Sequence, residues 1–314
     1  MKIDAVVIGR ISADLVPTET HTPLERVSGF SRAVGGFGGN VAVALARLRI
    51  PVALLACVGD DGHGRYVSQA LAGEGVNVEG VRAVPNVRTP LAFMELWPPD
   101  RFPITFYPTA AYWALEEADV VEATIAAAPA LVVSGTSLAH EPSRSATSRA
   151  LAIHHTARST GTAAQRTVLD IDWRPALWSD ARTYRERVAG ALPFADVVVG
   201  GAEEFGAADV DPAALARTTP IVIVKRGRAG VTVIEGERAV DIPAHRVETV
   251  NGLGAGDGFV AAFVAALLRG LGAARAGARG NAAGAIVASR LSTSWAMPTD
   301  EEIDALMART AAIA

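Results

Sequence analysis

The chain alternates between two hydrophobic patterns. Short, fully apolar runs predict buried strands, and longer runs with apolar residues every three or four positions predict helices. The predicted strands are 5–9, 52–58, 130–134, 167–171, 195–199, 221–224 and 231–234. The main predicted helices are 41–48, 65–72, 144–158 and 259–271. This alternation indicates an α/β protein whose mostly parallel sheet is covered by helices on both faces.

Two segments depart from this rhythm and read as paired strands outside the core. Residues 88–97 alternate between apolar and polar, a turn follows at 98–100, and 104–107 reads as the returning strand. Aromatic residues recur in this hairpin. Each of them either stacks on a bound ring or fills an interface between two copies of the chain, and the pattern does not choose between these roles.

Composition narrows the class of protein. The 314 residues suffice for one large α/β domain or two small ones. Lys and Arg number 29 against 33 Asp and Glu, and this net charge of −4 argues against nucleic acid or an anionic membrane as a partner. No apolar run is long enough to span a bilayer. The single cysteine, Cys57, fits a reducing compartment, so we expect a cytoplasmic protein.

A glycine-rich segment at 250–259 stands directly before the predicted helix 259–271. Such a turn directs backbone N–H groups and the positive end of the helix dipole toward one point, which suits phosphate. Asp257 either caps the helix or acts as a general base that removes a hydroxyl proton. The Gly-x-Gly-x-Gly spacing without a following Lys argues against both a dinucleotide fingerprint and a P-loop.

Three further polar clusters follow predicted strands or precede helices. Asp14 lies just beyond the first strand, as a turn residue or a ligand contact. The glycine run 35–39 is either a flexible turn that Asn40 ends as a helix cap or a close approach of backbone to a ligand. Asp172 and Arg174 follow strand 167–171, where open parallel sheets bind ligands. They form a structural ion pair, or Arg174 binds a carboxylate.

These motifs together resemble those of the ribokinase-like (PfkB) carbohydrate kinases. The Gly-Ala-Gly-Asp core at 254–257, Gly-Gly-x-x-x-Asn at 35–40 and Lys-x-Gly-x-x-Gly at 225–230 occur in the family's order, and the resemblance covers nearly the whole chain. It implies one α/β domain over 1–314 with a three-layer ribokinase-like fold. The central sheet would be mostly parallel, with helices on both faces, and a small β lid would be inserted at about 12–33 and 88–112.

The resemblance also implies roles for particular residues. Asp257 would be the catalytic base, and the backbone N–H groups of Gly254, Ala255 and Gly256 would form the anion hole. The sugar would be bound by Asp14, Gly35, Gly36, Asn40 and Arg174, and the nucleotide by Lys225, Gly227, Gly230, Asn281 and Gly284. Glu204 would hold magnesium through water. ATP and Mg²⁺ are the implied cofactors, a monovalent cation is an option, and the lid is a candidate homodimer contact.

Within the family, segment 169–178 is similar to the Asp-Ile-Asp-Tyr-Arg-Pro-x-x-Trp of 5-dehydro-2-deoxygluconate kinases of inositol breakdown, with Trp173 replacing Tyr. One departure stands against this subgroup. Its members carry an Arg after the second lid hairpin, where this chain has Pro108. If that Arg binds the acid end of the substrate, this protein prefers a different or neutral sugar.

We therefore expect an ATP-dependent kinase that transfers the γ-phosphoryl group to a primary hydroxyl of a sugar or sugar acid, with 5-dehydro-2-deoxygluconate as the leading candidate. The alternatives within the class are 2-keto-3-deoxygluconate, fructose and nucleoside kinases. The alternative from another class is a non-catalytic sugar or nucleotide sensor on the same fold. Asp257 argues against the sensor, because a protein that only binds gains nothing from a base at this position.

Overall fold

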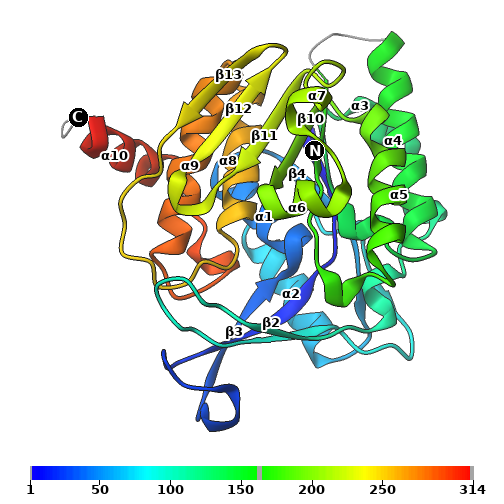
Figure 1. Cartoon of the computed structure of the whole chain (residues 1–314). Helices are drawn as coiled ribbons and strands as arrows, with labels where there is room; N and C mark the ends of the chain where they lie inside the picture. Colours follow the sequence, from blue (N-terminus) through cyan, green and yellow to red (C-terminus); the bar gives the residue numbers. More distant parts are fainter. Residues whose placement is uncertain (1, 161–164, 312–314) are drawn as a thin grey trace.

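The computed structural model describes residues 2–160 and 165–311, and within them nine strands form one sheet. Their order across the sheet is β13 (Arg238–Ile242), β12 (Val231–Glu235), β11 (Ile221–Lys225), β10 (Val197–Gly201), β9 (Arg166–Asp170), β8 (Ala130–Ser134), β1 (Ala5–Ile8), β4 (Val52–Gly59) and β5 (Val81–Val84). The strands from β5 to β11 pair in parallel, and only β12 and β13 add antiparallel edges. The expected mostly parallel sheet is confirmed (Figure 1).

Successive side chains of each strand point to opposite faces, so both faces of the sheet are apolar. Val7 pairs in register with Leu54 and Val132, and these three residues belong to one buried cluster. The next residue back, Val6, lies in the other cluster. Uninterrupted apolar strands are therefore explained by burial on two sides.

Helices cover each face, giving three layers. The first face carries α1 (Gly36–Arg47), α2 (Gly62–Gly73), α8 (Ala255–Leu268), α9 (Ala273–Ala288) and α10 (Asp300–Ala311). The second face carries α3 (Glu122–Ala127), α4 (Ser143–Thr160), α5 (Ala181–Ala191), α6 (Ala202–Ala208) and α7 (Pro212–Leu215). In Figure 1 the green helices α4 and α5 lie on one side and the orange α8 and α9 on the other.

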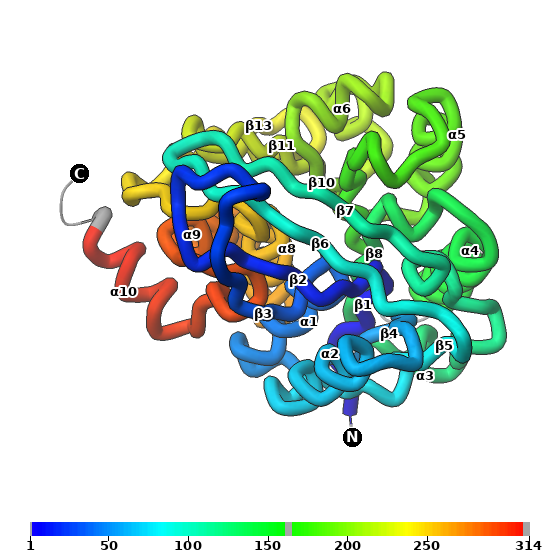
Figure 2. Tube along the Cα trace, turned by 90° about the horizontal axis from the view of Figure 1, so that it is seen from below, coloured from blue at the N-terminus to red at the C-terminus, as the bar shows by residue number. Residues whose placement is uncertain are grey.

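A second, four-stranded sheet lies where β1 leads into β2, and Figure 2 shows its strands across that end of the molecule. Its order is β3 (Phe30–Gly35), β2 (Ser12–Pro17), β6 (Leu91–Met94) and β7 (Ile104–Tyr107). We call this sheet the lid. The strand predicted at 88–97 is shorter in the structure, where β6 covers Leu91–Met94. At its N-terminal side, Thr89 is hydrogen-bonded instead to the carboxylate of Asp61 at the start of α2, through its N at 2.9 Å and its Oγ1 at 2.7 Å.

Two predicted helix starts are corrected. Helix α8 begins at Ala255 rather than at 259, and α1 begins at Gly36 rather than at 41. In both cases the first turn is rich in glycine, Gly36-Phe37-Gly38-Gly39 in α1 and Ala255-Gly256-Asp257-Gly258 in α8, and carries no repeating apolar pattern. Packing explains their helicity: a side chain on Gly258 would place its Cβ 2.9 Å from Val287 of α9, so the close approach of the two helices requires glycine there.

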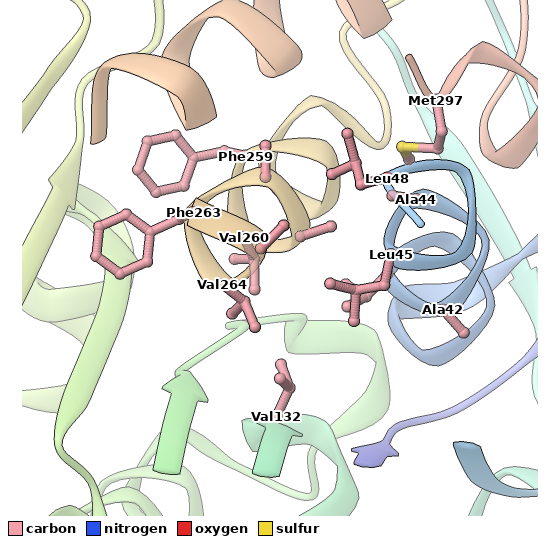
Figure 3. Close-up of a cluster of buried hydrophobic side chains, with 14 of the residues drawn as sticks. Ala42, Ala44, Leu45, Leu48, Val132, Phe259, Val260, Phe263, Val264 and Met297 are labelled. Carbon is pink, nitrogen blue, oxygen red and sulfur yellow. The ribbon is translucent and has the colours of Figure 1, made fainter. Parts of the chain in front are cut away.

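The core between α1 and α8 holds the site together. Figure 3 shows Leu45 and Leu48 of α1 and Val260 and Val264 of α8 above Val132 of the sheet. All five side chains are almost fully buried. Because these contacts fix the two helices relative to each other, they also fix the residues at their N-terminal ends.

Candidate active site

The first turn of α8 carries the predicted base. The N-cap is Gly254, whose backbone has φ of +81°, a conformation that favours glycine. Because glycine has no side chain, this helix start has no side-chain cap. Asp257 lies three residues into the helix. Its alternative role as the N-cap is therefore wrong. The first N–H groups of this helix lack intrahelical acceptors, as at every helix start; that of Ala255 makes only a long contact of 3.4 Å to Gly252 O.

Asp257 is oriented from α1. The Asn40 side-chain amide donates a hydrogen bond of 2.7 Å to Asp257 Oδ2. Asn40 is thus not the helix cap, since α1 has already begun four residues earlier. Burial raises the pKa of Asp257, and the nearby Asp172 adds to the shift, while Asn40 and two arginines oppose it. A carboxylate whose pKa is raised toward neutrality is better matched to accepting a proton.

A pocket lies beside Asp257 and beneath the lid. It is lined by the predicted residues Asp14, Gly36, Asn40, Arg174, Gly254 and Asp257, and also by Arg10, Ser12, Phe106, Asp172 and Thr293. Gly35 does not line it; a side chain there would put Cβ 1.8 Å from Asp14 Oδ1. Gly35 therefore makes room for the carboxylate of Asp14 rather than facing the pocket itself.

Asp14 is buried in strand β2 and accepts a hydrogen bond of 2.8 Å from Ser12 Oγ. Burial raises the pKa of this carboxyl to about 6, although the hydrogen bonds from Ser12 and Thr293 act in the opposite direction. At neutral pH such a group is largely ionised and accepts hydrogen bonds from ligand hydroxyls.

Asp172 organises one wall of this pocket. Its Oδ1 pairs with Arg174 Nε at 3.0 Å, and its Oδ2 lies 3.5 Å from Arg10 Nη2. Ser134 and Thr136 donate to the same Oδ2 at 2.8 and 3.1 Å. Burial alone would raise the pKa of Asp172, but Arg10, Arg174 and Ser134 outweigh it and lower the pKa to about 2. The expected Asp172–Arg174 pair is present, and Arg174 nevertheless lines the pocket.

Arg10 is the residue that the sequence reasoning missed. It follows β1, whereas Asp172 follows β9, and β8 with Ser134 lies between these strands. The three strands end side by side, so their C-terminal residues meet. The available signal was a charged residue placed directly after the first buried strand. Arg10 is only 8% exposed.

A larger pocket of about 590 Å³ lies on the other side of the α8 turn. It is lined by all five residues predicted to bind the nucleotide, Lys225, Gly227, Gly230, Asn281 and Gly284, together with Ala255 and Gly256. Its volume lies in the range typical of pockets for small-molecule ligands. Asn281 is held in place by donating a hydrogen bond of 2.6 Å to Pro243 O.

Lys225 brings a positive charge to the end of this pocket nearest α8. Its Nζ pairs with Asp170 at 2.9 Å and with Glu204 at 3.5 Å. A Cβ on Gly256 would lie only 3.4 Å from that Nζ, so the ammonium borders the first turn of α8. Although burial acts against it, the two carboxylates raise the pKa of Lys225 above its usual range. The lysine therefore stays charged, as a contact to phosphate requires.

Glu204, the predicted magnesium residue, lies next to Lys225 but does not line either pocket. It accepts a hydrogen bond of 2.5 Å from Gly201 N at the start of α6. Within residues 2–160 and 165–311, no group of three or more His, Cys, Asp or Glu is arranged to hold a metal ion. Mg²⁺ commonly needs only one or two carboxylates when phosphate oxygens and waters complete its shell, so this donor set fits a nucleotide-bound ion.

The α8 turn forms the wall between the two pockets. Gly254 and Asp257 face the smaller pocket, and Ala255 and Gly256 face the larger one. A hydroxyl held in the smaller pocket would meet a base, and a phosphate held in the larger one would meet N–H groups and an ammonium. This arrangement suits in-line transfer of a phosphoryl group.

No helix in the part of the chain that the structure describes could cross a membrane.

Comparison with known proteins agrees with this geometry. The sequence model of the pfkB family carbohydrate kinases matches residues 2–300. A 5-dehydro-2-deoxygluconokinase of Photobacterium profundum is 36% identical, over 95% of this chain and 93% of its own length. A protein of the same name from Listeria monocytogenes is 31% identical, over 98% of this chain and 97% of its own. A putative ribokinase II from E. coli, solved with ATP and Mg²⁺, superposes with a TM-score of 0.87 at 23% identity, over 98% of this chain and all of its own.

Proposed function

Because this chain belongs to the pfkB family of carbohydrate kinases and is an ATP-dependent sugar kinase, we propose that its substrate is a sugar acid, 5-dehydro-2-deoxygluconate. Two relatives that match nearly the whole chain bear that activity in their names. This substrate has a carboxylate at one end and a primary hydroxyl at the other. Family membership sets aside the sensor alternative.

One observation supports the mechanism of transfer: the α8 turn separates a pocket with Asp257 from a pocket with Ala255 and Gly256. The sugar occupies the first and the nucleotide the second. Asp257 accepts the proton of the primary hydroxyl, while the oxygen of that hydroxyl forms a bond to the γ-phosphorus of ATP. The bond from that phosphorus to the bridging oxygen breaks, and ADP leaves. A positioned base of this kind typically contributes about 10²–10⁴-fold in rate.

The remaining residues bind and orient. Lys225 and the first N–H groups of α8 stabilise the charge on the transferring group, while Gly227, Gly230, Asn281 and Gly284 accommodate the nucleotide. Glu204, next to Lys225, would hold a magnesium ion through water. Magnesium supplies neutralisation of phosphate charge when it is bound. On the sugar side, Asp14 and Asn40 take the hydroxyl groups.

The absence of the subgroup's lid Arg at Pro108 favours a neutral sugar, but two other arginines, Arg10 and Arg174, line the pocket and suit an acid. Arg174 lines the pocket and shares Asp172 with Arg10. An acidic ligand would add a second carboxylate to these two cations. Fructose and nucleoside kinases remain the competing assignments, and a substrate panel decides between them.

The test is ADP release from folded enzyme with ATP, Mg²⁺ and a panel of substrates. We expect 5-dehydro-2-deoxygluconate to give the highest kcat/KM, above 2-keto-3-deoxygluconate, D-fructose and adenosine. Chelating the magnesium with EDTA should stop turnover, and adding excess Mg²⁺ should restore it. Comparing K⁺ with choline in the buffer tests for a monovalent cation. A higher kcat/KM for a neutral sugar than for either acid would contradict the proposed substrate.

We also propose that two copies of the chain associate through their lids. Phe30, Phe93 and Tyr107 form successive edge-to-face ring contacts on the lid, with centroids 5.4 and 5.5 Å apart. Tyr107 is 54% exposed. An aromatic patch on an accessible sheet is a common place for protein contact. Light scattering on the wild type and on Tyr107→Ser should show a dimer that the substitution weakens; a monomer in both would contradict this contact.

A further inference from the structure

We propose that Arg10 recognises the carboxylate of the substrate and so takes over the role of the arginine that the lid lacks at Pro108. The inference rests on the proposed function, because it concerns the acid end of that substrate. It assigns to one residue the choice between an acidic and a neutral sugar.

Arg10 is buried, yet two of its nitrogen atoms have no partner. Nε and Nη1 are shielded from solvent and make no hydrogen bond within the described protein. Only Nη2 meets a counter-charge, 3.5 Å from Asp172 Oδ2. Buried polar groups in folded proteins are almost always hydrogen-bonded, so unpaired guanidinium donors at a pocket wall indicate a ligand that completes them. The residue lines the pocket that also contains Asp257.

The side chain is held in a fixed position. Its guanidinium carbon lies 5.9 Å from the ring centre of Phe106 in lid strand β7 and 6.0 Å from that of Tyr112. Asp172 anchors Nη2, and Ser134 and Thr136 hold Asp172 in turn. A cation fixed by aromatic rings and a buried carboxylate loses little further freedom when it binds, which favours affinity.

Arginines and carboxylates share this pocket, which Arg10 and Arg174 line together with Asp14, Asp172 and Asp257. Arg10 and Arg174 bring two positive charges to one wall, and they share the single carboxylate of Asp172 through different oxygen atoms. A guanidinium presents its donors in a planar fork that matches a carboxylate. A substrate carboxylate would give the unpaired Nε and Nη1 of Arg10 a charged acceptor. Its primary hydroxyl, at the other end of the molecule, would then be free to reach Asp257.

The position of Arg10 explains why the lid arginine is dispensable. In this chain the guanidinium of Arg10 is supplied by the loop after β1 and not by the lid. The lid contributes the aromatic ring of Phe106, which packs against that guanidinium. A third arginine, supplied by the lid, would crowd a pocket that already holds Arg10 and Arg174. Pro108 at the end of β7 is consistent with a lid that encloses the acid without bonding it.

Kinetics of two variants against two substrates test this inference. Arg10→Gln removes the charge, and Arg10→Met also keeps the apolar volume between Phe106 and Tyr112. The matched control is Arg88→Gln, an exposed arginine outside both pockets. For each protein, kcat/KM is measured for 5-dehydro-2-deoxygluconate and for D-fructose. The loss of a hydrogen-bonded charge pair in a closed site predicts a fall of about ten-fold or more for the acid, with little change for fructose.

The outcomes separate the two proposals. The inference is supported if the wild type prefers the acid, both Arg10 variants lose this preference and Arg88→Gln keeps it. Equal losses for acid and fructose in a folded variant show that Arg10 is structural and overturn it, while the proposed substrate stands. Wild type that prefers fructose overturns both. Calorimetric titration with D-gluconate and with its neutral counterpart D-glucitol measures binding without turnover. Relative to Arg10→Gln, the variant Arg10→Lys should recover part of the affinity for gluconate.

Discussion

Asp14 illustrates how burial changes a single side chain that also has a functional role. Its pKa of about 6 lies above the ordinary value of 3.8, mainly because burial disfavours the charged form. The folded protein therefore binds a proton at this site more tightly than the unfolded chain does. The contribution of Asp14 to stability falls as the pH rises from about 4 to about 6, and the full cost is present above that range.

Replacing Asp14 by Asn should therefore stabilise the free protein in a pH-dependent way. A shift of about two pKa units corresponds to about 3 kcal/mol, so the free energy of unfolding should rise by up to that amount at pH 8 and hardly at all below pH 4. Urea denaturation at the two pH values measures it. Asp60→Asn, at an exposed position, should show no such dependence. A stabilisation of Asp14→Asn that does not change with pH would contradict the assignment.

At the scale of residues, the family motifs identified most of the glycines, acids and cations that line the two pockets, because these residues recur at fixed spacings; their binding roles stay predictions. Lys225, Asn281, Asn40 and Asp257 all lie at the pockets where they were expected. Arg10 was not predictable in this way. Its partner Asp172 is 162 positions away, since 172 − 10 = 162, and only the order of β1, β8 and β9 in the sheet brings them together.

At the scale of elements, the pair α1 and α8 positions the base. Strands were predicted closely, because a run buried on both faces has a clear apolar signature. The starts of α1 and α8 were predicted too late, because their first turns are rich in glycine. Intrinsic propensity disfavours a glycine helix. Tertiary packing overrides this propensity, because α9 packs closely against the first residue of α8. A Cβ at Gly284 of α9 would lie 3.0 Å from Ala255 O.

Truncating Leu45 tests this element pair. The side chain is fully buried and points from α1 toward α8 (Figure 3). Leu45→Ala should lower the free energy of unfolding by about 2–5 kcal/mol through lost transfer energy and a residual cavity. Leu291, which is 41% exposed, provides the matched control, and Leu291→Ala should stay within about 0.5 kcal/mol. Equal losses in the two variants would show that α1 and α8 are not packed as described.

At the scale of the whole molecule, the lid and the nucleotide side are in contact. Arg228, in the hairpin between β11 and β12, donates a hydrogen bond of 2.9 Å to Pro99 O at the tip of the lid. Both residues line the larger pocket. The hairpin at 88–107 could be recognised in the sequence by its alternation, whereas the lid strands near 12–33 were expected only from the family resemblance. The place of the lid over the smaller pocket follows from the pairing of β2 with β6.

Arg228→Ala should therefore weaken nucleotide binding. The KM for ATP should rise a few-fold, because a hydrogen bond, here an exposed one, is worth about 0.5–1.5 kcal/mol. Arg226 of the same hairpin pairs with Asp241 outside the pocket, at 3.0 Å. Arg226→Ala should leave the KM for ATP near that of wild type, since exposed ion pairs contribute little. An unchanged KM in Arg228→Ala would show that this lid contact does not assist nucleotide binding.

The most direct test of the account is the turnover of Asp257→Asn with ATP, Mg²⁺ and 5-dehydro-2-deoxygluconate. Asn matches the shape of Asp and keeps an oxygen that can accept the hydrogen bond from Asn40, but it cannot accept a proton. We predict a loss of about 10²–10⁴-fold in kcat, with the melting temperature and ATP affinity unchanged or slightly raised. Glu203→Gln, an exposed acid in the first turn of α6, should keep normal kcat. A kcat of Asp257→Asn within a few-fold of wild type would contradict the role of Asp257 as the base.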